Sequence, residues 1–149
     1  MSSTFLYGAN VRANGIRQHY LRYGGATGAR ATRAAIVLIP GITSPAITWG
    51  FVGEVFGAAF DTYVLDVRGR GLSDASPTLD YSLDAQADDV AALVAALGLS
   101  RTSLVGHSMG ARIAARAARR GIRGLVDPPV SGPGRRAYPG KLPWYIDSI

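Results

Sequence analysis

The stretch TSLVGHSMGARIAARA, residues 102–117, decides the fold of this chain. Residues 102–105 have the length and character of a short buried strand, and the alanine-rich residues 109–120 favour a helix. Between them, Gly106-His107-Ser108-Met109-Gly110 matches the pattern G-x-S-x-G, whose glycines let a strand turn sharply into a helix and expose the serine oxygen. We therefore predict a strand-to-helix turn that presents Ser108 as a nucleophile.

A serine that attacks a carbonyl group needs two N–H donors for the oxyanion that develops. Met109 follows Ser108 directly and begins the expected helix, where the helix dipole favours negative charge. The second donor is expected in the turn Pro40-Gly41-Ile42-Thr43, which follows the apolar run 35–39. We predict that the N–H groups of Met109 and Ile42 form the oxyanion hole, although a simple strand-ending turn at residues 40–43 is the alternative.

The rest of the chain alternates strands and helices. Residues 35–39 and 62–65 are continuous apolar runs, as in parallel strands covered on both faces. Asn14-Gly15 favours a tight hairpin within residues 10–23. We also expect helices over residues 46–60, 82–97 and 109–120, the second capped by Ser82, and a last strand over residues 122–126. This order predicts an α/β fold, with a mostly parallel sheet and an antiparallel N-terminal ribbon.

The last of these strands should form an edge of the sheet. We expect residues 122–126 to lie beside residues 102–105 and to have no strand on their other side. An unpaired apolar edge is a site of aggregation. The sheet is therefore expected to stop after about the sixth strand.

A third motif follows the apolar run 62–65. The residues Asp66-Val67-Arg68-Gly69-Arg70-Gly71-Leu72-Ser73 have the form D-x-R-G-x-G-x-S. This motif, the G-x-S-x-G segment and their spacing resemble the α/β-hydrolase superfamily. The resemblance implies the α/β-hydrolase fold, and it implies structural rather than chemical roles for Asp66 and Arg68.

A longer resemblance is carried by residues 7–11, 14–25, 40–51 and 126–139, which are similar to the N-formylmaleamate deformylase family. It implies a small-molecule substrate, hydrolysis of an N-formyl amide to maleamate and formate, a Ser-Asp-His triad and no cofactor. The triad acid of that family falls on Asp127 here. Asp127 also ends a short apolar run before Pro128-Pro129, which would place it at the carboxyl edge of the sheet, where sites form in α/β proteins. A residue that only caps this turn is the open alternative.

The chain departs from the family in two ways. It has two histidines. His19 lies in the opening ribbon and His107 directly before Ser108, and neither is in a position that suits a general base. Because the fold orders its triad as serine, acid and then histidine, we expect the histidine outside these 149 residues and no activity from them alone. The segment 119–126, between the expected helix and Asp127, is also shorter than the family pattern. A displacement of Asp127 from the position of the family's acid is therefore an open alternative. We expect residues 1–127 to be the front of one domain, and residues 128–149 to begin a cap or form a disordered tail.

Charge and composition argue against a nucleic-acid-binding, metal-binding or membrane function. The net charge is +6, but all except one of the 16 basic residues are arginines spread along the chain. The dense run from Arg112 to Arg123 has near-helical spacing, which favours a solvated helix face over a nucleic-acid site. With no cysteine and two separated histidines we expect no metal, and with no long apolar segment we expect a cytoplasmic protein without membrane contact. Oligomeric state is not readable from this sequence.

Three other functions compete with the deformylase. An esterase of the same fold could act on another acyl group, because fold does not determine substrate. A truncated product or an interaction protein without catalysis is the second alternative. A dinucleotide-binding protein is disfavoured because no G-x-G-x-x-G motif follows the first core strand at 35–39.

Overall fold

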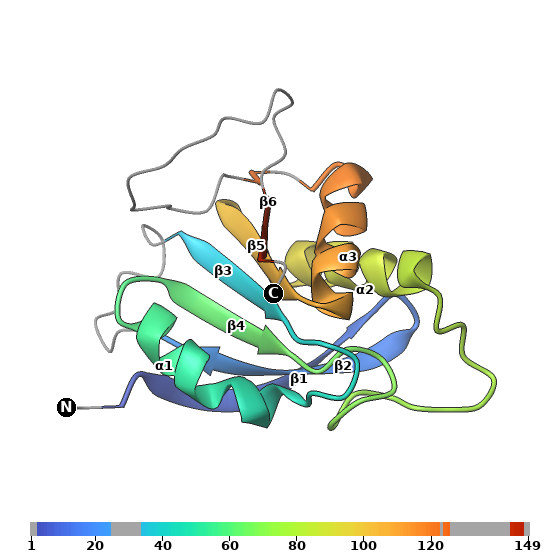
Figure 1. The fold of residues 1–149 in the computed structure, drawn as a ribbon, viewed down its shortest axis with the longest axis horizontal. Coiled ribbons are helices and arrows are strands. Elements are labelled where there is room, and N and C mark those ends of the chain that lie inside the picture. The colour runs from blue at the N-terminus through green and yellow to red at the C-terminus, as the bar shows by residue number, and fades with distance from the viewer. Residues whose placement is uncertain (1–2, 25–33, 123, 126–143, 148–149) are drawn as a thin grey trace.

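The computed structural model describes residues 3–24, 34–122, 124–125 and 144–147. Its centre is one mixed sheet with the strand order β1-β2-β4-β3-β5-β6. β3 lies in the middle and runs parallel to β4 and β5, whereas β1 and β2 form an antiparallel ribbon at one side (Figure 1). The strands are β1 (Phe5–Ala13), β2 (Ile16–Tyr23), β3 (Ala35–Ile39), β4 (Asp61–Leu65), β5 (Thr102–His107) and β6 (Trp144–Asp147).

Every residue of β3 and β4 is buried because helices cover both faces of the sheet. Val37 and Ile39 point to the face covered by α2 (Leu83–Ala96) and α3 (Met109–Ala117). Ile36 and Leu38 point to the opposite face, covered by the 3-10 turn η1 (Ala46–Trp49) and α1 (Gly50–Gly57) (Figure 1). Alternate strand residues point to opposite faces, so one five-residue apolar run supplies two cores. The parallel α/β arrangement expected from the sequence is confirmed.

The turn and helix-cap residues singled out in the sequence adopt the expected conformations. Asn14 and Gly15 have φ values of 52° and 76°, as a tight hairpin turn between β1 and β2 requires. Ser82 caps α2, and its Oγ accepts a hydrogen bond from the Ala85 N–H at 3.1 Å. The helix expected over residues 46–60 is divided into η1 and α1, and the one expected over residues 109–120 ends as the 3-10 turn η2 (Ala118–Arg120).

The last strand expected over residues 122–126 is not formed by its described residues, 122, 124 and 125. In this segment, Leu125 makes only an isolated bridge to Thr102. Gly121 and Gly124 have φ values of 69°, which interrupts an extended run. The edge of β5 is instead paired with β6, in parallel, from Leu104↔Trp144 to His107↔Asp147. A stretch rich in aromatic and β-branched residues suits that place, so this edge of β5 is covered rather than exposed.

Within the part of the chain that the structure describes, no helix has both the length and the apolar character needed to cross a membrane.

Candidate functional site

Ser108 lies at the sharp turn between β5 and α3, in a backbone conformation that few residues adopt. Its φ and ψ are 54° and −118°, and among the described residues only Asn14 shares a positive φ without being glycine. Such a conformation costs of order 1–3 kcal/mol and concentrates at functional sites. Ser108 occupies the N-cap position of α3, yet its side chain makes no capping hydrogen bond. The hydroxyl is therefore left available for chemistry.

Glycines make this turn possible because α3 begins directly against two strands. A Cβ atom at Gly106 would overlap the Gly110 backbone, and one at Gly110 would overlap the Ile39 carbonyl oxygen at the end of β3. Only hydrogen fits at either position. The two glycines of the motif thus bring the first turn of α3 onto the end of β3.

The turn after β3 lies beside the nucleophile. A Cβ atom at Gly41 would be 3.5 Å from the Ser108 Cβ and 3.3 Å from the His107 Nδ1. β3, β4 and β5 are parallel, so the loops that follow them meet at one edge of the sheet. This is the edge at which α/β proteins place their sites. The segment that carries Ile42 and the segment that carries Met109 are brought together there.

The loop after β4 is hydrogen-bonded to the turn that carries Ile42. Arg70 Nε donates to the Ile42 carbonyl at 2.8 Å, and Arg70 Nη1 donates to the Arg68 carbonyl at 2.9 Å. Asp66 Oδ1 accepts from the Ala46 N–H at 2.6 Å, and its Oδ2 accepts from the Leu72 N–H at 3.1 Å. These contacts hold both loops in place around the site.

His19 belongs to the hydrogen-bond network around Asp66. Its Nδ1 lies 2.7 Å from Asp66 Oδ2, and both side chains are buried. A Cβ atom at Gly8 would be 3.0 Å from His19 Nε2, so the ribbon covers the other nitrogen. Because both ring nitrogens are enclosed, His19 is not placed to take a proton from substrate or nucleophile.

His107 is the last residue of β5 and directly precedes Ser108. Its ring packs on Trp49, with centroids 5.5 Å apart. Asp127 lies outside the described residues. Another carboxylate residue, Asp147, stands at the register position of His107 in β6.

Arg68 also has a structural partner, as its motif implied. Its Nε and Nη2 donate to the two carboxylate oxygens of Asp89, both at 2.6 Å, and both side chains are buried. The Asp89 carboxylate raises the pKa of Arg68. This bidentate pair joins α2 to the loop after β4.

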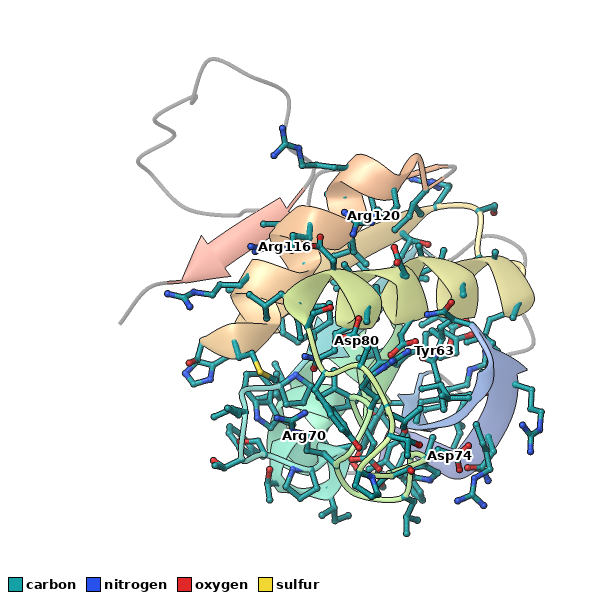
Figure 2. The ribbon with its side chains drawn as sticks, turned by 90° about the vertical axis from the view of Figure 1, so that its right-hand side faces the viewer. Tyr63, Arg70, Asp74, Asp80, Arg116 and Arg120 are labelled. Carbon is teal, nitrogen blue, oxygen red and sulfur yellow. The ribbon has the colours of Figure 1, made fainter. Side chains whose placement is uncertain are left out.

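The arginine-rich face of α3 and η2 is a separate surface that carries ion pairs to α2. Arg116 and Arg120 pair with Asp84 of α2, and Arg120 also pairs with Asp88. Figure 2 places Arg116 and Arg120 at the helical layer, well apart from Arg70. No group of three potential metal ligands occurs among the residues that the structure describes.

Comparison with known proteins decides the family. The model of the alpha/beta hydrolase fold matches residues 34–129, which include β3, the loop after β4 and the turn at Ser108. The chain belongs to the alpha/beta hydrolase family.

Two curated relatives and one solved structure show what this alpha/beta hydrolase is similar to. N-formylmaleamate deformylase of Pseudomonas putida is 66% identical over 152 residues, which cover 99% of this chain and 54% of that enzyme. A crystal structure of N-formylmaleamic acid deformylase from Pseudomonas putida superposes with a TM-score of 0.70 and 55% identity, over 91% of this chain and 52% of that one. 2-(Acetamidomethylene)succinate hydrolase of Mesorhizobium japonicum is 47% identical over 53 residues, 36% of this chain and 19% of that enzyme. The chain spans about half the length of the deformylases that it matches.

Sequence reasoning located the turn at Ser108 but missed how this alpha/beta hydrolase holds the neighbouring loops. The D-x-R-G-x-G-x-S motif indicated that Asp66 and Arg68 are structural, without indicating His19 or Asp89 as partners. Arg70 had no assigned role, because it fills the variable position between the two glycines of the motif. Only its contact with Ile42, 28 residues away, reveals it.

Proposed function

We propose that this chain is part of a serine hydrolase that removes the formyl group of N-formylmaleamate, giving maleamate and formate. The observation that carries the proposal is the 66% identity to N-formylmaleamate deformylase over nearly the whole chain, with Ser108 at a strained turn in the same stretch. No cofactor enters this reaction, and the substrate is a small molecule.

In the first step, the Ser108 oxygen attacks the formyl carbon. The C–N bond of the formyl amide then breaks, the nitrogen receives from the base the proton that Ser108 gave up and leaves as the amide of maleamate, and Ser108 becomes a formyl ester. Water cleaves this ester to formate and restores the serine. Both steps pass through an oxyanion, for which the Met109 and Ile42 N–H groups are the proposed donors. The position of Gly41 against Ser108, and of Met109 at the start of α3, supports these assignments.

Ser108 needs a base to take its proton, and an acid to orient that base. His19 is enclosed beside Asp66, and the exposed His107 ring packs on Trp49 directly before Ser108 in the chain, so we propose that the base is a histidine supplied from outside the 149 residues. Asp127 is the proposed acid. Ile42 and Leu72, in the two loops beside the site, are 57% and 64% exposed, which fits a site that further protein covers.

The named substrates of two relatives share a chemical class. N-formylmaleamate and 2-(acetamidomethylene)succinate are both acyl amides on a carboxylic acid skeleton. We propose the same class for this protein. An esterase specific for another acyl group is the competing function, since the same turn and oxyanion hole would serve it.

The proposal is tested by joining residues 1–149 to the part of the Pseudomonas putida deformylase that they do not cover. We expect this joined protein to release formate from N-formylmaleamate at a turnover of about 1 to 10³ s⁻¹. The 149-residue chain alone should release none above the rate in buffer, because Ser108 has no base. Turnover by the chain alone would contradict the missing-base proposal. Hydrolysis of an aryl ester, but not of N-formylmaleamate, would favour the esterase.

Asp127 and Asp147 provide a matched pair of variants for the triad acid. We expect Asp127→Asn in the joined protein to lower kcat by about 10⁴, since an amide stabilises the wrong histidine tautomer. Asp147→Asn should leave kcat within about threefold of the parent. Formate release by both variants, measured beside their melting curves, separates a catalytic loss from a folding loss. The reverse pattern would transfer the role to Asp147.

A further inference from the structure

We propose that Arg70 is a specificity-determining residue whose guanidinium group binds the carboxylate of the substrate. This assignment rests on the proposed function, because it requires an acyl amide that carries a carboxylate. The basis for it is the position of Arg70, its unpaired charge and its distance from Ser108.

Arg70 is held at the edge of the sheet where Ser108 lies. It belongs to the loop after β4, and its Nε and Nη1 donate to the carbonyls of Ile42 and Arg68 at 2.8 and 2.9 Å. Two carbonyl contacts fix the plane of the guanidinium group without neutralising its charge. A cation fixed in this way loses little side-chain entropy when it binds an anion.

Arg70 combines an unpaired charge with a fixed position. Arg12, Arg101, Arg112 and Arg119 also lack an ion pair among the described residues, but no side-chain hydrogen bond to a described residue holds them as two hold Arg70. Five other arginines form ion pairs with aspartates: Arg17 with Asp74, Arg22 with Asp61, Arg68 with Asp89, and Arg116 and Arg120 with Asp84. Arg70 has no carboxylate partner among the described residues, and its Nη2 has no hydrogen-bond partner among them. A partly buried cation with a free N–H edge can bind an anionic ligand.

The distances suit the proposed substrate. The Ile42 carbonyl is 2.8 Å from Arg70 Nε, and Ile42 is next in the chain to Gly41, whose Cβ position is 3.5 Å from the Ser108 Cβ. Arg70 Nε is therefore at most about 14 Å from the Ser108 Cβ, because the intervening bonds and the step of about 3.8 Å between consecutive Cα atoms set the longest possible path. In N-formylmaleamate the carboxylate lies roughly 5 Å from the formyl carbon, at bond lengths of about 1.3 to 1.5 Å. With contacts of about 3 Å at either end, the substrate reaches over roughly 11 Å, which is within this limit.

Arg70 could instead act only by positioning Ile42, and the two roles predict different kinetics. Loss of a carboxylate anchor weakens binding of the acid but not of a neutral analogue. Loss of an oxyanion-loop contact lowers kcat for both. N-formylmaleamate and its methyl ester are the matched substrates that separate these roles.

We expect Arg70→Gln in the joined protein to raise KM for N-formylmaleamate roughly tenfold to a hundredfold, the effect of losing a hydrogen-bonded charge. Its KM for the methyl ester should change less than about twofold, and Arg70→Lys should recover part of the binding of the acid. Arg119→Gln, an exposed arginine near Arg120, is the control and should change neither value. If Arg70→Gln fails to fold, the KM values of Arg70→Lys for the acid and for its methyl ester are compared instead.

An equal fall of kcat on both substrates, or no change on either, would overturn the assignment. Calorimetric titration of maleamate into the joined protein gives a comparison without turnover, and Arg70→Gln should weaken this binding by a similar factor. If neither substrate releases formate while maleamate binding still depends on Arg70, the proposed function fails and the carboxylate site stands. If formate is released and maleamate binds both proteins equally, only the carboxylate site fails.

Discussion

Replacing Ser108 with alanine should lower the kcat for formate release in the joined protein by about 10⁶. The hydroxyl forms the covalent intermediate, and without it only the oxyanion hole and substrate binding remain to accelerate attack by water. Folding should be unaffected, because the Ser108 side chain makes no capping hydrogen bond in α3. Formate release and thermal melting of the purified variant measure both effects.

Ser100→Ala is the matched control for this loss. Ser100 is exposed in the turn before β5, so its replacement removes a serine of the same region without touching the site. We expect its kcat to stay within about twofold of the parent. If Ser108→Ala keeps more than a tenth of the parent kcat while it folds normally, Ser108 is not the nucleophile.

Gly110→Ala should destabilise the joined protein by about 3 kcal/mol, which would lower its Tm by roughly 6 to 12 °C. Alanine normally stabilises a helix by about 1 kcal/mol relative to glycine, so helix propensity alone predicts the opposite sign. The loss is expected because a Cβ atom at this position would overlap the Ile39 carbonyl oxygen and lie 2.6 Å from the Pro40 carbonyl oxygen. α3 would have to move away from β3.

Gly24→Ala tests whether this effect belongs to the contact or to any buried glycine. A Cβ atom at Gly24 would meet its nearest neighbour, Asp61 Oδ1, at 3.5 Å, which is ordinary contact. We expect its stability to change by less than about 1 kcal/mol, because the entropy that alanine removes from the unfolded chain offsets small adjustments. Equal melting temperatures for Gly110→Ala and the parent would show that α3 does not approach β3 so closely.

Local patterns predicted most of the described fold. The hairpin at Asn14-Gly15, the buried runs that became β3 and β4, and the Ser82 cap of α2 each depend on a few neighbouring residues. The same holds for the turn at Ser108, whose glycines and flanking periodicities are contiguous. Such features are readable from sequence because steric limits and side-chain periodicity act over a few residues.

The last strand was mispredicted for a related reason. Residues 122–126 have an apolar pattern, but a pattern does not show which segment pairs with an open strand edge. Gly121 lies directly before that segment and Gly124 lies within it, both at positive φ, and β6 occupies the edge from about 20 residues further along the chain. Strand pairing depends on competition between segments across the whole fold, and this competition leaves no local signal.

The sequence by itself determined the alternation of strands and helices, the α/β class and the position of Ser108 at a sharp turn. The tertiary structure alone decided that Asp66 holds His19 and the Ala46 N–H, and that Arg70 donates to Ile42. These groups are 20 to 47 residues apart in sequence. They meet because parallel strands bring successive loops to one edge of the sheet, where hydrogen bonding depends on distances in space that residue order does not encode locally.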